Sequence, residues 1–301
     1  SLATISTGAS AVIGTGTAWM VTMYRFPGRD TVSWLLLLPL AMPTYIGAMC
    51  YAELLEFSGP VQTSLRALTG WTSAKDYWFP EIRSLPGAVT VIALVLYPYV
   101  YLTARASFLQ QSACALEVAR TLGRTPRGVF WEVALPLARP ALAAGVTLVL
   151  MEALNDIGAV QHLGVRTLTV AIYDTWLQRS NLGGAAQIAT VMLICILLLL
   201  AMERRARGQG SYHNTTSRYR PIPFAKLRGW RGRAAFLVCL APVVLGFMLP
   251  VGLLVHTSWR HAGVILAGSF WSAAWHSLVL AALAATLAVA VGLMLAYARR
   301  V

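Results

Sequence analysis

Three side chains that carry oxygen ligands stand close together near the end of one apolar run: Glu152, Asn155 and Asp156. Glu152 and Asp156 are four residues apart, so a helix would place both carboxylates on one face. Hard oxygen ligands suit a hard cation such as ferric iron. A carboxylate inside a membrane helix costs about 2.5–3.5 kcal/mol, so it should face protein or water. Two hypotheses stay open here: a substrate site, and a helix-end cap or ion pair with an outer Arg such as Arg166.

The other metal-binding residue types form no comparable group. Tyr97, Tyr99 and Tyr101 are possible ferric ligands, but aromatic packing between helices explains them more simply. No two of the five His residues are four positions apart, so we expect no His cluster for a metal. The four Cys residues form no CxxC pair, and three of them lie in apolar runs, where Cys is usually a small buried hydrophobe. The sequence predicts neither a disulfide framework nor a zinc site.

The elements that must position these residues are membrane helices. The chain is 57% hydrophobic and 12% charged, with a mean hydropathy of +0.65, whereas soluble domains carry about 25% charged residues. A span needs about 20 mostly apolar residues. The segments that meet this requirement are 1–23, 31–51, 87–108, 137–157, 185–203, 234–256 and 277–298. The sequence therefore predicts an all-α, polytopic membrane protein with about seven spans.

The net charge of +13 is unevenly distributed along the chain. If the polar interval 113–140 lies in the cytoplasm, all but six of the 24 Lys and Arg residues fall on the cytoplasmic side. The six outside are Arg66, Lys75, Arg83, Arg166, Arg179 and Arg260. Cytoplasmic loops of membrane proteins carry such an excess. Orientation therefore explains the positive charge, and nucleic-acid binding is not needed to explain it.

Two connecting segments are unusual in composition. Residues 204–233 contain nine Lys and Arg residues among Gly, Ser and Pro, which predicts a basic cytoplasmic linker beside anionic headgroups, at about 1 kcal/mol per cation. A regulatory site is the alternative there. The outer loop 52–86 is long and rich in aromatic residues. Long ordered loops tend to be functional, and an aromatic belt at the membrane interface is the alternative or additional explanation.

The last apolar run resembles the first. Gly14 aligns with Gly292 in the same register that aligns Ala18-Trp19 with Ala296-Tyr297. This indicates a second copy of the whole unit that begins near residue 277. We therefore expect the chain to be a fragment of a longer repeat protein. The expected organisation is a first core unit over 1–203, the linker over 204–233 and the start of a second unit over 234–301.

The interval from Glu117 to Pro140 is polar, helix-patterned and sharply punctuated. A helical pattern with one apolar face runs from Ala113 to Leu122. Gly123 is expected to end this helix in a left-handed conformation. Thr125-Pro126 is expected to begin the next helix, with Thr as N-cap and Pro at the first helical position. Leu135-Pro136 is expected to break that second helix before the next span, which leaves a rigid helix–turn–helix with an apolar side.

These residues follow a family pattern. Glu-x-Ala-x-x-x-Gly, then nine residues, then Val-x-Leu-Pro, resembles the EAA loop of permease subunits of ATP-binding-cassette importers. The matching positions are Glu117, Ala119, Gly123, Val133, Leu135 and Pro136; Val118 departs, because the family usually has Ala there. The resemblance implies a helical bundle of the type I importer (MetI-like) permease kind. It also implies that the EAA loop (residues 113–140) is cytoplasmic and that residues 113–128 form the coupling helices.

Further segments resemble the iron(III) importer permeases with two fused halves. They are 26–29, 37–43, 77–85 and 96–101. The resemblance implies import of ferric iron from a periplasmic or external binding protein, across a bacterial inner membrane. It also implies two ATPase subunits, each holding one EAA loop. Neither Lys75 nor Lys226 follows a Gly-rich loop of Walker A spacing, so we expect ATP and Mg²⁺ to be bound by the partner subunit and not by this chain.

Other functions remain to be compared with this one. Importers of thiamine, phosphonate, sulfate or polyamines share the EAA loop, although the long outer loop and its Tyr-Trp-Phe-Pro stretch favour iron. A membrane-embedded enzyme should show clustered His, Asp or nucleophile motifs, and only the Glu152/Asp156 pair is present. A passive channel has no need of an EAA loop. The sequence therefore predicts a transport permease in the lipid bilayer, with no catalytic residue of its own.

Overall fold

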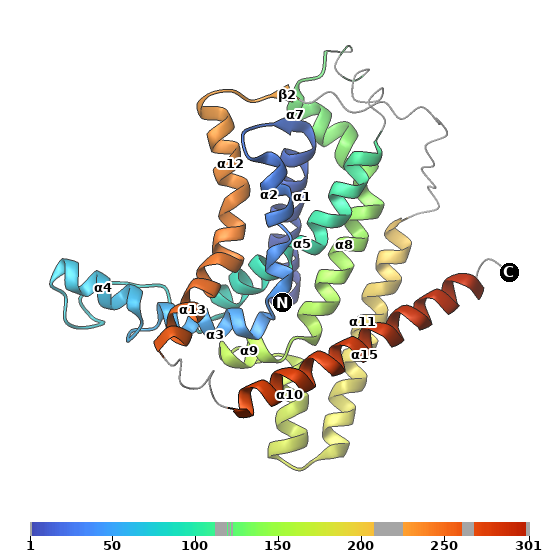
Figure 1. Cartoon of the computed structure of the whole chain (residues 1–301). Helices are drawn as coiled ribbons and strands as arrows, with labels where there is room; N and C mark the ends of the chain where they lie inside the picture. The colour runs from blue at the N-terminus through green and yellow to red at the C-terminus, as the bar shows by residue number, and fades with distance from the viewer. Residues whose placement is uncertain are drawn as a thin grey trace. The chain divides into compact units, whose positions relative to one another are not determined.

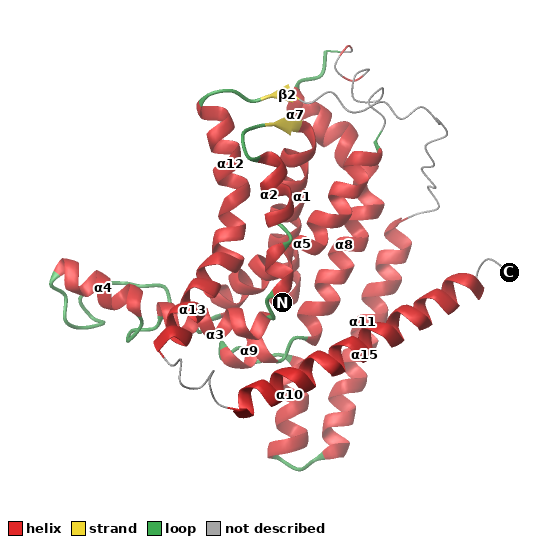
Figure 2. Cartoon of the chain, in the orientation of Figure 1, coloured by secondary structure: helices red, strands yellow, loops and turns green. Residues whose placement is uncertain are grey.

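The computed structural model describes residues 2–111, 119, 121, 123–207, 225–260 and 268–298. These residues form helices and one short parallel pair of strands (Figure 2). The elements are α1 (Leu2–Met23), β1 (Tyr24–Arg25), α2 (Arg29–Leu35), η1 (Leu38–Ala41), α3 (Thr44–Leu55), α4 (Pro60–Thr69), α5 (Leu85–Gln110), α7 (Pro126–Val129), η2 (Phe130–Ala134), α8 (Leu135–Asn155), α9 (Gly158–His162), α10 (Leu168–Tyr173), η3 (Asp174–Gln178), α11 (Leu182–Arg207), β2 (Ala225–Lys226), α12 (Trp230–Val243), η4 (Val244–Met248), α13 (Leu249–Arg260) and α15 (Gly268–Ala298). The prediction of an all-α membrane protein is confirmed.

Five helices in the described part of the chain are long and apolar enough to cross a membrane. They are Leu85–Gln110, Phe130–Asn155, Leu182–Ala201, Trp230–Arg260 and Phe270–Ala298. A bent pair of helices would make a sixth span if its two arms are counted together. These five match the last five predicted spans, whereas the first two predicted spans differ from expectation.

The first predicted span forms a helix, α1, that is too polar to be counted with these five. Most of its hydroxyl side chains are buried, and several donate to carbonyls of the preceding turn: Thr17 Oγ1 to Ile13 O at 2.7 Å and Thr22 Oγ1 to Ala18 O at 2.7 Å. Bonds of this kind satisfy a hydroxyl without water. Small and hydroxyl residues are typical of helix–helix interfaces in membranes. α1 therefore packs one face against α5 and α8, while its other face, which carries Ile5 and Val12, is exposed.

The second predicted span, 31–51, is not one continuous helix. α2 and η1 run to Ala41, and α3 starts at Thr44 after a bend of 92°. The break falls at Met42, which is extended (φ −106°, ψ 121°) and precedes Pro43. Proline pushes the residue before it out of the helical region. The prediction of a single helix over 31–51 is wrong for this reason.

α5 is the central helix of the bundle, and three other elements approach it at glycines. A Cβ at Gly14 of α1 would lie 2.8 Å from Tyr97 O, and one at Gly145 of α8 would lie 2.9 Å from Val100 Cα. A Cβ at Gly246 of η4 would collide with the carbonyl of Leu94. Small residues let membrane helices come close enough for their backbones to pack. These glycines therefore set the spacing of α1, α8 and η4 around α5.

The chain forms two compact units, residues 1–251 and 252–301. In the first, α1, α5, α8 and α12 run alongside one another, with α7 and β2 at one end and α3 and α9 at the other (Figure 1). β2, which lies within the basic linker (204–233), pairs with β1 at the end of α1, and Leu227 N donates to Arg25 O at 2.9 Å. In the second unit α15 is a single long helix. The division into a core unit, a linker and a second core unit stays a prediction.

Candidate functional site

The EAA loop lies at the end of the first unit where α1 and α5 finish and the two strands pair (Figure 1). Of the six matching residues, Glu117 is outside the described residues. Ala119 is buried, and its core cluster includes Val129, Ala134 and Phe108. The small residue at position 119 therefore faces the bundle, as a docked helix with an apolar side requires.

The turn at Gly123 has the conformation expected from the sequence. Its φ is +81°, and Arg124 N donates to Ala119 O at 3.1 Å. This bond spans six residues, which is the bond that closes a helix in a Schellman motif. Among the described residues, no atom lies within 4 Å of the position that a Cβ on Gly123 would take. Glycine is therefore required at this position by backbone conformation and not by crowding within the chain.

The second helix of the loop begins as expected at Thr125. Gly128 N donates to Thr125 Oγ1 at 3.2 Å, and Val129 N donates to Thr125 O at 2.9 Å. These are the bonds of an N-cap threonine. Arg124 and Glu132 form a two-point ion pair across the turn, at 3.1 and 3.2 Å. Because both side chains are about half exposed, this pair orders the turn more than it stabilises the fold.

The second helix does not end at Leu135-Pro136, so that part of the prediction is wrong. α7, the π-helical turn η2 and α8 follow one another without a break, and Leu135 N donates to Phe130 O. Pro136 has no N–H, and Leu135, the residue before it, donates the bond that closes the wider π turn. The position without an N–H donor therefore falls just after the π turn, where the hydrogen-bond pattern returns to that of an α-helix. The same solution recurs at Leu249-Pro250, which follows the π turn η4.

Two contacts fasten the π turn to the membrane helices. Gln111, just after α5, donates from Nε2 to Ala134 O at 2.8 Å in a buried position. Trp19 of α1 packs against Phe130, with 4.9 Å between ring centroids, and against Phe108 of α5 at 5.4 Å. A force on η2 therefore reaches both α1 and α5 through direct side-chain contacts.

The tip of the loop is left open to solvent. Thr121, Gly123, Arg124 and Thr125 are exposed, and so is Trp131, at 65% of its surface. Ala119 and Val129 anchor the loop from below. The loop therefore presents an exposed, preformed turn whose base is packed on the bundle.

The residues at the other candidate site are not held together as a ligand set. Asp156 follows the last helical residue of α8 in an extended conformation (ψ 114°), and its Oδ1 accepts from Ala159 N at 2.9 Å. It thus caps α9, while its Oδ2 is buried with no hydrogen-bond partner among the described residues; the role of these residues in substrate binding stays a prediction. Glu152 and Asn155 are exposed on α8. Among the residues that the structure describes, no group of three His, Cys, Asp or Glu side chains could hold a metal ion.

The tyrosines of α5 pack in the bundle. Tyr97 and Tyr101 are fully buried in the core cluster that contains Ala119, and Tyr101 OH donates to Ser33 O at 2.9 Å. Tyr99 is half-buried and packs against the second core cluster. These positions agree with the aromatic packing that the sequence favoured over iron ligation.

Comparison with known proteins identifies the family. Residues 10–206, nearly two thirds of the chain, match the family described as "Binding-protein-dependent transport system inner membrane component". The chain belongs to this family. The matched region contains α1, α5, α8 and the whole EAA loop, so the geometry described above is that of a member of this permease family.

Three relatives carry different substrate names. The chain is 26% identical over 292 residues to an Fe(3+)-transport system permease protein of Haemophilus influenzae. It is 33% identical over 193 residues to a "Probable molybdenum ABC transporter permease protein" of Haloferax volcanii, and 31% over 196 residues to a sulfate transport system permease protein of Escherichia coli. These matches cover 95%, 64% and 64% of the chain. The chain spans about half the length of the iron relative (53%) and about two thirds of the other two (66% and 68%).

Sequence reasoning missed the contacts that tie this permease's EAA loop to its bundle. Gln111 and Trp19 belong to no motif, and their partners lie 23 and 111 positions away in the chain. The sequence indicated the Arg124–Glu132 pair only weakly, through two opposite charges that flank a predicted turn and the start of a helix. A polar Gln directly after a long apolar helix was the one available hint of a buried hydrogen bond.

Proposed function

We propose that this chain is part of the transmembrane permease subunit of an ATP-driven importer, and that its EAA loop docks on an ATPase subunit. The observation that carries the proposal is the loop itself: an exposed turn at Gly123 above a base packed on α1 and α5. A rigid surface element joined to packed helices can pass a partner's rigid-body motion into the bundle. Family membership supports the same function, because the relatives are named as transport permeases.

In this mechanism each described residue of the loop has a separate role. Gly123 and Thr125 shape the turn that the ATPase would hold, and Ala119 lets the first helix sit close to the bundle. Phe130 and Ala134 pass the motion on, through Trp19 to α1 and through Gln111 to α5. Val133, Leu135 and Pro136 continue into α8 without a break, so α8 moves with the loop. ATP chemistry would belong to the partner, and this chain would supply no catalytic residue.

We propose ferric iron as the substrate, delivered by a periplasmic or external binding protein. The support is the extent of the match: the iron relative aligns over 95% of the chain, which includes residues beyond 206, whereas the sulfate and molybdenum relatives align over 64%. Sulfate or phosphonate transport is the alternative, since relatives with those names match 64% and 69% of the chain.

The proposed location is the bacterial inner membrane, with the EAA loop in the cytoplasm. Arg25 and Lys226 are brought together by the strand pairing at the end of the first unit that holds the loop. Arg124 is exposed at that same end. This clustering of cations at one end supports the orientation given by the positive-inside rule.

Transport by the full-length permease, reconstituted in vesicles with its ATPase and binding protein, tests both proposals. We expect ATP-dependent uptake of radioactive iron(III) and no uptake of sulfate or molybdate. Uptake of an oxyanion instead would overturn the substrate and leave the permease function standing. Absence of any ATP-dependent uptake, together with failure of an ATPase to co-purify, would overturn the permease function itself.

Substitutions of Glu152 and Asp156 should have different effects on uptake in such an assay. We expect Glu152→Gln to slow iron uptake, because Glu152 is an exposed acidic side chain near the end of a membrane span. Asp156→Asn keeps the oxygen that caps α9, so uptake should be unchanged. Equal uptake by wild type and both variants would remove Glu152 from the substrate pathway. Loss in Asp156→Asn alone would show that Asp156 is more than a cap.

A further inference from the structure

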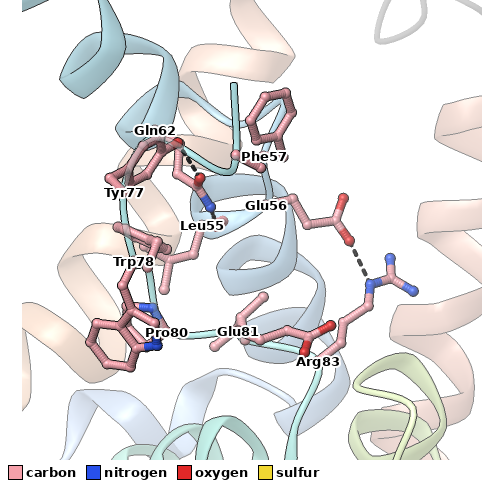
Figure 3. A pocket seen from close by; sticks show the side chains of 12 residues that line it. Leu55, Glu56, Phe57, Gln62, Tyr77, Trp78, Pro80, Glu81 and Arg83 are labelled. Carbon is pink, nitrogen blue, oxygen red and sulfur yellow. Dashed lines mark hydrogen bonds and ion pairs between the residues drawn. The ribbon is translucent and has the colours of Figure 1, made fainter. Parts of the chain in front are cut away.

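The outer loop between α3 and α5 is folded into a compact platform, residues 56–83, around α4. Gln62 donates from Nε2 to Leu55 O at 2.8 Å and accepts from Tyr77 OH at 2.6 Å. Arg66 donates to Tyr77 Oη at 3.1 Å, and its guanidinium lies 4.0 Å above the ring of Phe57. In Figure 3 Gln62 and Tyr77 meet on one side of the platform's pocket. One long side of α4 is thus tied to the loop.

The rest of the platform is held in the same way. Trp71 stacks on Tyr77 with 4.9 Å between centroids and an angle of 9°. Asp76 Oδ2 accepts from Thr72 N and Ser73 N at 3.0 and 2.8 Å, and these bonds lower the pKa of that carboxyl. Glu56 and Arg83 close the opposite side of the pocket with an ion pair (Figure 3). The platform is therefore preformed and needs no partner to order it.

The other side of α4 carries an apolar stripe. Val61, Leu65 and Leu68 are four and three residues apart, so they lie on one face of the helix. Leu68 is 86% exposed, and Trp78, in the loop that follows α4, is 85% exposed. Thr63 and Ala67 lie on the side of the helix away from this stripe. α4 is thus amphipathic: Gln62 and Arg66 bond within the platform, and on the apolar face Leu68 and Val61 (38%) are exposed while Leu65 is half-buried.

The direction and the level of α4 match a membrane surface. The arm formed by α3 and α4 is bent by 92° from α2 and η1, and Figure 1 shows α4 reaching sideways from the bundle at the end away from α7. The platform ends where Ser84 caps α5, the helix that begins the next span, by accepting from Gly87 N at 3.3 Å. α4 therefore crosses the direction of the spans near the level at which a span begins.

We propose that α4 lies in the outer interface of the membrane, with Val61, Leu65 and Leu68 in the acyl boundary and Trp78 in the headgroup layer. A short helix with a strong apolar face and low net hydrophobicity lies in the plane of the interface, and Trp is enriched at that depth. The three cations of this platform, Arg66, Lys75 and Arg83, are matched in number by Glu56, Asp76 and Glu81, so the placement rests on the apolar face of α4 and on Trp78. The apolar face of α4 thus contacts the lipid surface.

A spin-label scan of α4 tests this placement. The full-length permease, with its native cysteines replaced, would carry one label at a time at positions 60–69 and be reconstituted in vesicles of phosphatidylethanolamine and phosphatidylglycerol. We expect labels at Val61, Leu65 and Leu68 to collide more with oxygen than with a water-soluble nickel complex. Labels at Thr63 and Ala67 serve as matched controls on the same helix, and they should show the reverse. Wild-type membrane yield would show that each labelled variant folds.

Each other result of the scan overturns the proposal. Equal access of the nickel complex at all positions would mean that α4 stands in water. Protection of the stripe from both oxygen and nickel would mean that a protein surface covers it. As a second measurement, Leu68→Asp should abolish the preference for oxygen at a label on Val61, whereas Thr63→Asp should leave it intact. An unchanged preference in Leu68→Asp would contradict anchoring through this stripe.

Discussion

Gly123→Val in the full-length permease is expected to abolish ATP-driven uptake while membrane insertion stays normal. Gly123 has a φ of +81°, a conformation that costs an ordinary L-residue about 1–2 kcal/mol and that a β-branched residue rarely adopts. Val at this position would pull the backbone away from the left-handed region. The bond from Arg124 N to Ala119 O would then open, and the exposed turn would lose its shape.

Gly123→Asn is the matched control for this substitution. Asn adopts the left-handed conformation more readily than other non-glycine residues, and no atom of the described residues lies within 4 Å of a Cβ at this position. We therefore expect Asn to keep most of the uptake that Val loses. ATP-dependent uptake and co-purification of the ATPase from membranes should fall together in the Val variant and stay near wild type in the Asn variant.

Two outcomes would contradict this explanation of Gly123. Normal uptake with Val would show that the turn does not couple the permease to ATP hydrolysis. Equal loss with Val and Asn would show that the partner needs the bare backbone of glycine, so that contact with the ATPase, and not the left-handed turn, explains the residue.

The part of the EAA loop that was predictable is the part decided by local chemistry. The left-handed φ at Gly123 and the capping bonds of Thr125 depend on residues within five positions of each other, and both are present. The continuation of the helix through Leu135-Pro136 was not predictable in this way. A Leu-Pro pair ends many helices, and only the π turn before it shows how this one continues.

The bundle shows the same division between local and distant causes. Apolar length correctly predicted the later spans, because lipid contact imposes composition on each helix separately. α1 depends on its neighbours, and its buried hydroxyl groups make sense only once one face of it packs on α5 and α8. The candidate site at Glu152 and Asp156 also rested on helical spacing. That spacing ends at Asn155, where Asp156 leaves the helix to cap α9.

Gly14→Ala is expected to destabilise the permease more than its single added methyl group suggests. A Cβ at Gly14 would lie 2.8 Å from Tyr101 N, Tyr97 O and Val100 Cβ. Two of these atoms belong to the backbone of α5 and cannot move aside as the end of a flexible side chain can. Overpacking of this kind costs about 1–3 kcal/mol and occasionally more. α1 would be pushed from α5, and the contact between Trp19 and Phe108 would loosen.

Gly16→Ala, two residues further along the same helix, separates crowding from any general effect of alanine. No atom lies within 4 Å of a Cβ at Gly16, and alanine favours a helix over glycine by about 0.5–1 kcal/mol. Thermal unfolding of the purified permease in detergent should therefore begin at a lower temperature in Gly14→Ala and at an equal or higher one in Gly16→Ala. If both variants unfold like wild type, α1 does not pack on α5 at Gly14. Because Trp19 also holds Phe130 of the EAA loop, Gly14→Ala should weaken coupled uptake even below its unfolding temperature, which Gly16→Ala should not do.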